Sequence, residues 1–161
     1  MKRVLLIALF AIFGLGVSNT NAQEIKLGAM AALPMGEMDD WLSVGFGIDF
    51  AVLWEVGDDF YVGGATGYHH FLGEEWEIMG TKFPAVDFQY IPLAATARYF
   101  VADNLYLGAD LGYGIGVGDT SGGDFYYRPK AGYNFGQIGL NVSYGGLDNF
   151  SFLGLGIEFG L

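Results

Sequence analysis

A period of two in the placement of apolar residues is the feature that most constrains how this chain can fold. Between Leu153 and Leu161 every odd position carries leucine, isoleucine or phenylalanine, and every even position carries glycine or glutamate. Successive side chains of a β-strand point to opposite faces, so this alternation predicts strands with two different faces. Eight segments share it and are expected to form strands: Glu24–Leu33, Trp41–Trp54, Phe60–Phe71, Tyr90–Val101, Leu105–Ile115, Phe125–Phe135, Ile138–Gly145 and Phe150–Leu161.

The composition narrows the fold class further. Hydrophobic residues make up 52% of the chain and aromatic residues 17%, and there are 27 glycines. No apolar run after residue 22 approaches the ~20 residues that a membrane-spanning helix needs. Apolar residues in short, regularly spaced segments indicate a β-barrel or a β-sandwich. The chain has no cysteine, so disulfides and thiolate metal sites do not contribute to this fold.

The first 22 residues differ from the rest. Lys2 and Arg3 precede an apolar run from Val4 to Val17, and small or polar residues follow up to Ala22. This order of basic, apolar and small segments predicts a secretory signal peptide over residues 1–22. A single domain is then expected over residues 23–161.

The two strand faces have different chemistry. The apolar face carries no charge; in the second segment it takes the even positions from Leu42 to Trp54. The other face is mostly glycine, alanine, serine and asparagine, too poor in charge for a surface in water. Small residues inside and large apolar residues outside fit a barrel in lipid. We therefore expect an all-β fold, an eight-stranded antiparallel up-and-down transmembrane β-barrel.

The connections between the expected strands alternate in length. Odd-numbered connections are longer than their neighbours, and residues 102–104 and 136–137 form tight turns. This predicts long loops at one end of the barrel, with short turns and both termini at the other.

One segment resembles a known family. The sequence IPLAATARYF at Ile91–Phe100 resembles the P-L…A-R-Y strand common in small bacterial outer-membrane β-barrel proteins. The last strand resembles their assembly signal, although it ends in Leu161 where the family usually has an aromatic residue. The resemblance implies a barrel of the OmpA-transmembrane-domain or OmpX kind in the bacterial outer membrane. The expected partners are outer-membrane lipids, lipopolysaccharide and the barrel-assembly machinery, and the expected state is a monomer. It implies no single activity.

Seven charged residues on the inner face form the first candidate site: Lys26, Asp49, Arg98, Asp110, Arg128, Lys130 and Glu158. An eight-stranded barrel is only about wide enough for its own side chains, and buried charges must be paired. Lys26 and Glu158 lie near the ends of strands that are neighbours in a closed barrel, and Arg98 and Asp110 share one hairpin. We expect a plug of ion pairs; a lumen that conducts is the alternative.

His69 and His70 are expected at the outer rim. Two alternatives are a metal site with Glu74, Glu75 and Glu77, and lipid hydrolysis, which would need a serine that the sequence does not place nearby. No cofactor and no catalytic residue is expected.

The outer connections carry ten acids and one base, Lys82. The acids are Glu37, Asp39, Asp40, Glu74, Glu75, Glu77, Asp87, Asp119, Asp124 and Asp148. Such a surface does not fit nucleic acid. It fits repulsion between neighbours, divalent cations that bridge to lipopolysaccharide, or a basic extracellular partner.

Three functions remain open. A non-enzymatic barrel with a structural or surface-interaction role comes first, because the lumen is expected to be plugged. A narrow channel for small or apolar solutes and a lipid-modifying enzyme are the alternatives.

Overall fold

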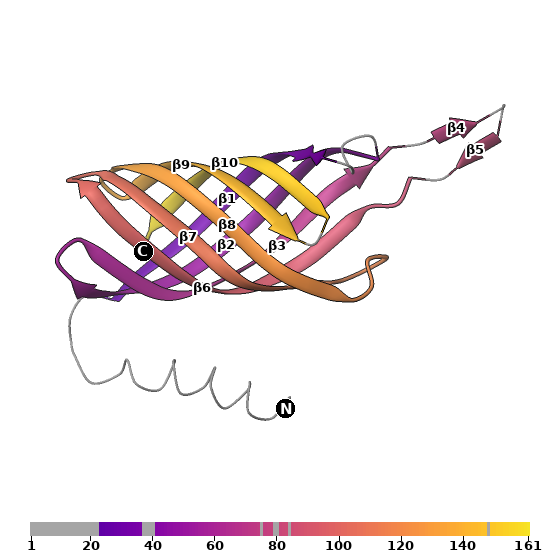
Figure 1. Ribbon diagram of the computed structural model, residues 1–161. Helices are drawn as coiled ribbons and strands as arrows, with labels where there is room; N and C mark the ends of the chain where they lie inside the picture. The colour runs from indigo at the N-terminus through magenta and orange to yellow at the C-terminus, as the bar shows by residue number, and fades with distance from the viewer. Residues whose placement is uncertain (1–22, 37–40, 75, 79–80, 84, 148) are drawn as a thin grey trace, which may run out of the picture.

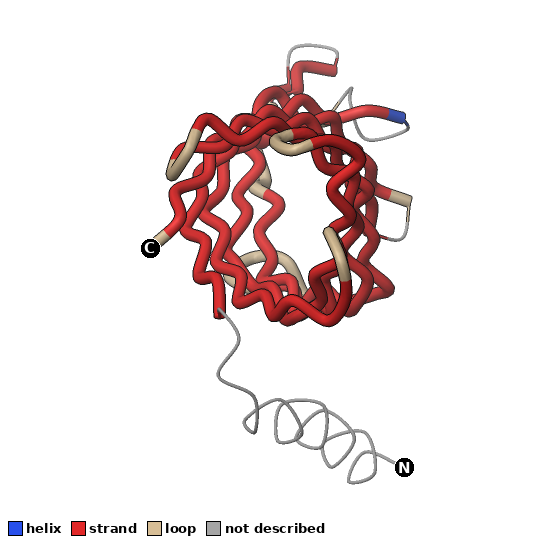
Figure 2. The backbone as a smooth tube through the Cα atoms, turned by 90° about the vertical axis from the view of Figure 1, so that its left-hand side faces the viewer, coloured by secondary structure: helices blue, strands red, loops and turns tan. Residues whose placement is uncertain are grey.

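Eight long strands close into one barrel in the computed structural model, which describes residues 23–36, 41–74, 76–78, 81–83, 85–147 and 149–161. The barrel order is β1-β10-β9-β8-β7-β6-β3-β2, with β1 paired to β2 to complete the ring. All pairs are antiparallel. The strands run obliquely around the axis (Figure 1) and form a closed ring when seen from the end (Figure 2). The expected signal peptide lies outside the described residues.

The strand bounds follow the alternating segments closely, which confirms the fold class. The barrel strands are β1 (Gln23–Met35), β2 (Leu42–Gly57), β3 (Phe60–Gly73), β6 (Phe88–Ala102), β7 (Leu105–Gly116), β8 (Gly123–Phe135), β9 (Ile138–Leu147) and β10 (Phe150–Gly160). Between β3 and β6, the short strands β4 (Trp76–Ile78) and β5 (Thr81–Phe83) pair as a hairpin. That hairpin was not predicted, since three residues are too few to show a period. It projects beyond the barrel at the end opposite the C-terminus (Figure 1).

Large apolar side chains cover the outside of the barrel. Leu140, Leu107 and Leu155 on neighbouring parts of the wall are 50%, 53% and 65% exposed. Exposed aromatic residues occur near both ends, for example Tyr113 at one end and Phe135 at the other. An apolar belt between aromatic rims is the surface that a barrel presents to lipid. No helix among the described residues is long and apolar enough to cross a membrane.

A β-bulge changes one predicted side-chain direction. The pairing of β2 with β3 shifts between Leu42 and Gly45, so that one extra residue is inserted on β2. An extra residue reverses the alternation beyond it. Leu42 was predicted to face lipid, but it points into the lumen and is 4% exposed.

Two prolines interrupt the ladders that hold the wall together. The pairing of β3 with β6 skips from Thr66–Leu93 to His69–Tyr90, which passes over Pro92. The pairing of β8 with β9 skips from Tyr127 to Lys130 and passes over Pro129. Proline has no N–H to donate, which explains both gaps. Each proline is still paired on its other side, with β7.

Candidate functional site

Two bidentate ion pairs cross the lumen. Arg98 Nη1 and Nη2 donate to Glu158 Oε2 and Oε1 at 2.8 and 2.9 Å. Arg128 donates from Nη1 and Nη2 to both carboxylate oxygens of Asp49 at 2.9–3.0 Å. In each pair the two strands, β6 with β10 and β8 with β2, have three strands between them in either direction around the ring. Each pair therefore joins opposite walls of the barrel.

The other lumenal bases have partners on their own side. Lys130 Nζ lies 2.8 Å from Asp110 Oδ2 on the neighbouring strand β7. Lys26 pairs with Glu24, which lies on β1 towards the end that carries the termini. Strand adjacency had suggested Lys26 beside Glu158 and Arg98 beside Asp110. The structure pairs them differently, because an arginine side chain is long enough to reach across so narrow a lumen.

The lumenal charges form one charged layer, which consists of Lys26, Asp49, Arg98, Asp110, Arg128, Lys130 and Glu158. Six of these residues are at most 7% exposed, and the Asp49 side chain is 21% exposed. A cavity among them, bordered also by Gly28, Ala51 and Ala65, has a volume of about 10 Å³. That is roughly the space that one water molecule needs. Tyr106 packs against the layer, with its ring under the Arg98 guanidinium at 4.8 Å and its hydroxyl donating to Glu158.

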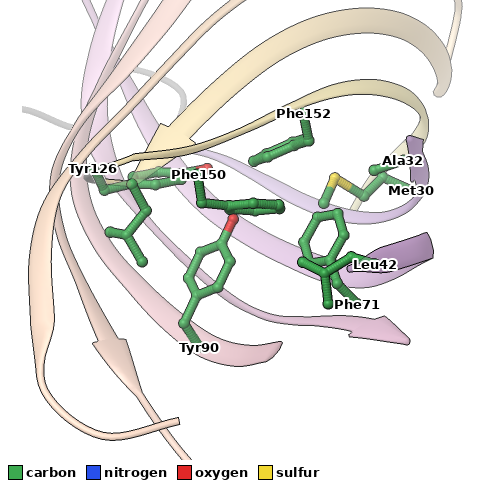
Figure 3. Close-up of a cluster of buried hydrophobic side chains, with 9 residues drawn as sticks. Met30, Ala32, Leu42, Phe71, Tyr90, Tyr126, Phe150 and Phe152 are labelled. Carbon is green, nitrogen blue, oxygen red and sulfur yellow. The ribbon is translucent and has the colours of Figure 1, made fainter. Parts of the chain in front are cut away.

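A second layer, mostly of aromatic rings, fills the lumen towards the end that carries the β4–β5 hairpin. We call it the aromatic layer; it consists of Met30, Ala32, Leu42, Phe71, Tyr90, Tyr126, Leu147, Phe150 and Phe152. Its rings converge from different strands (Figure 3). Phe71 lies 4.6 Å from Phe150 and 5.4 Å from Phe152 between ring centroids. The expectation that the inner face is mostly small residues does not hold for this half of the lumen, where large rings fill the space.

Lumenal glycines explain how the rings fit. A Cβ atom on Gly45 would lie 2.3 Å from the ring of Phe71, and one on Gly145 would lie 2.1 Å from the ring of Phe152. Both distances are shorter than any side chain tolerates. These glycines are therefore places where a ring from a neighbouring strand lies against the wall. From the sequence alone these glycines were expected on the inner face, without the rings that lie against them.

His69 lies inside the lumen and not at the outer rim where it was predicted. It is fully buried between the two layers. Its Nε2 is 2.9 Å from Asp49 Oδ1, and its Nδ1 is 2.9 Å from the Tyr90 hydroxyl. The reason is alternation: His69 shares its face with Phe71, and β3 continues beyond both to Gly73.

His70 faces outward near the end of β3. Its Nε2 lies 2.8 Å from Asp87 Oδ2, and its ring stacks on Phe46 with centroids 5.1 Å apart. Tyr68 lies 3.3 Å from the other ring nitrogen. Asp87 also accepts a hydrogen bond from the Gly73 N–H. That N–H, together with the His70 imidazole, holds the pKa of the Asp87 carboxyl below its usual value.

The surroundings of the two histidines bear on the two alternative chemistries. In each histidine, Nε2 lies next to a carboxylate oxygen and Nδ1 lies next to a tyrosine hydroxyl. A hydrolase would need a nucleophile there that substrate can reach. Among the described residues, no three histidines or acids are grouped so that they could hold a metal ion. The side chains of Glu75 and Glu77, two of the suggested ligands, lie outside the described part of the chain.

Comparison with known proteins identifies the fold. No family model and no curated protein matches the chain. A de novo designed transmembrane β-barrel matches with a TM-score of 0.57 and 12% identity, covering 89% of this chain and 98% of that one. The outer membrane protein Ail of Yersinia pestis, in a phospholipid nanodisc, matches with a TM-score of 0.58 and 18% identity, covering 87% and 100%. Neisserial surface protein A matches with a TM-score of 0.50 and 16% identity, covering 85% and 96%.

The fold is that of the small bacterial outer-membrane β-barrels. The apolar belt on the outside requires a lipid environment, and together with this fold it places the barrel in the outer membrane. The expected recognition, fold class and localisation are thereby confirmed. Identities this low identify the architecture and leave the activity to the residues of this chain.

Proposed function

We propose that the protein is a closed, monomeric, non-enzymatic outer-membrane anchor that presents its outer loops to a basic extracellular partner. The observation that carries the proposal is the filled lumen. Two ion pairs join opposite walls, and the aromatic layer closes the half of the lumen beyond them. The proposal keeps the barrel-assembly machinery as the partner that inserts the chain, and lipopolysaccharide as its neighbour in the outer leaflet.

The distribution of charge supports a basic partner. Of the five bases from Lys26 onward, four are buried in the lumen and only Lys82 belongs to an outer loop. Glu74, Asp119 and Asp124 are exposed near the outer end. Such a surface attracts cationic partners and repels polyanions. Glu37, Asp39, Asp40 and Asp148 would add to this charge but lie outside the described residues.

Ail offers a contrast in ligand chemistry. It has been solved in complex with sucrose octasulfate, a heparin analogue. A sulfated ligand does not fit an outer surface whose described charges are carboxylates. We propose that this barrel uses the same architecture for a partner of the opposite charge.

A hydrogen-bonded base supports the outer loops. Gln89 N–H donates to Thr120 Oγ1 at 2.9 Å, and Val117 N–H donates to the Gln89 carbonyl at 3.0 Å. The Gly73 N–H donates to Asp87 at 3.0 Å. The first two bonds attach the β7–β8 loop to the start of β6, and the third attaches the end of β3 to the segment that leads into β6. A fixed base reduces the ordering cost when a partner binds.

The test uses protein purified from membranes, placed in zwitterionic nanodiscs and immobilised through a C-terminal tag so that the outer end is free. We expect cytochrome c, a basic protein, to bind at low ionic strength and heparin not to bind. Replacing Glu74, Asp119 and Asp124 by their amides should weaken binding. The matched control replaces Glu55, Asp58 and Asp103 on the tethered end and should bind as the parent does. Heparin binding without cytochrome c binding would contradict the proposal.

A further inference from the structure

His69 lies where the two layers of the lumen meet. From the charged layer it contacts Asp49 on β2, which also holds Arg128 of β8. From the aromatic layer it contacts Tyr90 on β6 through a hydrogen bond, and the rings of Tyr126 and Phe152 lie 6.3 and 6.1 Å away. His69 is therefore hydrogen-bonded to a member of each layer.

A neutral imidazole satisfies both hydrogen bonds around His69. A carboxylate only accepts hydrogen bonds, so the hydrogen towards Asp49 is carried by Nε2 of His69. The other ring nitrogen, Nδ1, then accepts from the Tyr90 hydroxyl. The rings closest to Tyr90 are those of His69, Phe88, Tyr126 and Phe71. Among the described residues, His69 is the only hydrogen-bond partner of this hydroxyl.

The surrounding charges are balanced only while His69 stays neutral. Asp49 is already shared with Arg128, and Asp110 on β7, the next carboxylate, is paired with Lys130. Tyr90 on β6 and Tyr126 on β8 bring no further charge. A proton on Nδ1 would place a second cation beside Asp49. It would also turn the Tyr90 hydroxyl from a donor into an acceptor, with its hydrogen directed at aromatic rings.

We infer that His69 is a proton-binding site that controls the plug, so that the lumen is closed at neutral pH and loosens reversibly in acid. Protonation replaces the Tyr90 hydrogen bond by an unpaired hydrogen and puts a surplus positive charge into an enclosed layer. Both changes are relieved when the His69 ring moves away from Asp49 and Tyr90. Because His69 joins the two layers, that movement weakens the charged layer and the aromatic layer together. Histidine is the side chain that ordinarily changes charge between pH 5 and 8.

The inference rests on the closed lumen of the proposed function, and one experiment separates the two. Protein purified from membranes is inserted into planar bilayers, and its conductance is followed from about pH 7.5 to about pH 4.5, around the ordinary range of histidine. We expect silence at the higher pH and reversible openings at the lower one. The open fraction should rise by up to about ten-fold per pH unit, the limit for one bound proton.

Two matched variants assign the response. His69→Gln has an amide that donates to Asp49 and takes up no proton, so it should stay closed at both pH values. His70→Gln changes the outward-facing neighbour and should respond as the parent does. An equal acid response in His69→Gln, or no acid response in the parent, would overturn the switch. Steady current in the parent at neutral pH would overturn the closed anchor itself, and the switch with it.

A spectroscopic measurement keeps the inference testable if His69→Gln does not fold. The ring ¹⁵N shifts of His69 in nanodiscs should show a neutral imidazole protonated at Nε2 at neutral pH. They should change over the pH range in which openings begin. A ring that stays neutral while the openings occur would contradict the inference.

Discussion

The charged layer and the aromatic layer share one lumen but are held together by different interactions. In the charged layer, the two bidentate pairs join opposite walls, and each carboxylate depends on its arginine. In the aromatic layer, stability is distributed over many ring contacts, with ring centroids 4.6–6.4 Å apart. Removing a single partner should therefore destabilise the charged layer strongly. In the aromatic layer, the loss of stability should grow with the side-chain volume removed.

Removing one partner of a crossing ion pair should have the largest effect. Glu158→Ala leaves Arg98 buried without its carboxylate, and we expect unfolding in urea to become easier by about 3–5 kcal/mol. The double variant Arg98→Met, Glu158→Leu should lose much less, because no charge is left unpaired. Glu24→Ala, which removes the 34% exposed partner of Lys26, should cost less than Glu158→Ala, because this carboxylate is already partly solvated. Equal losses in all three would show that the crossing pair is not special.

Truncating a ring of the aromatic layer should come next. Phe152→Ala leaves a cavity among closely packed rings, and we expect a loss of about 3 kcal/mol in the same measurement. Phe135, whose ring is 62% exposed on the outside, provides the control, because lipid fills the space that Phe135→Ala creates. If both substitutions cost the same, the aromatic layer adds nothing beyond lipid contact.

Filling a glycine position should have an intermediate effect. Gly145→Val puts a side chain where the Phe152 ring lies, and overpacking of this kind costs about 1–3 kcal/mol. Gly57→Val is the control, because a Cβ there meets nothing within 4 Å. In the background of Phe152→Ala, Gly145→Val should recover part of its cost, which a double-mutant cycle measures. Simple additivity would contradict the ring-to-glycine contact.

The smallest effect is expected at the rim, outside both layers. The pKa of Asp87 is lowered by the Gly73 N–H and by His70. Its contribution is therefore fully present above the ordinary aspartate pKa of about 3.9 and is lost as pH falls through the lowered value. Asp87→Asn should cost about 0.5 kcal/mol at neutral pH and should remove this part of the acid dependence of unfolding. An unchanged pH profile would contradict it.

The sequence predicts the two layers unequally. Charges are rare on these strands, so Arg98, Arg128 and Glu158 stand out and their inward position follows from alternation. Aromatic residues are abundant on both faces, so their type carries no information about direction. Their position does: Tyr126 has the same parity as Arg128, and Phe152 the same parity as Glu158. Extending the parity of the charged residues along β1, β6, β8 and β10 would have placed the members of the aromatic layer on these four strands inside the barrel.

Other features could not be derived from alternation. The bulge that turns Leu42 inward depends on an extra residue between two pairing partners, which period-two patterns do not reveal. The pairing of Arg98 with Glu158 depends on side-chain reach across the ring, and strand adjacency gives the wrong partner. His69 and His70 are neighbours in sequence and were assigned together, although consecutive residues of a strand face opposite sides.

Pro92 and Pro129 interrupt the hydrogen-bonded ladders at two places in the wall and so divide the barrel into two arcs. One arc contains β8, β7 and β6, and the other contains β3, β2, β1, β10 and β9, with the ladder gaps at the two boundaries. Arg98–Glu158 and Arg128–Asp49 both run from one arc to the other, and so does the His69–Tyr90 hydrogen bond. These three contacts hold the two arcs together across the lumen. Breaking one of them should let the arcs move relative to each other at the interrupted β3–β6 and β8–β9 ladders. The backbone amides next to Pro92 and Pro129 should then exchange with solvent before those of the uninterrupted β1–β10 ladder.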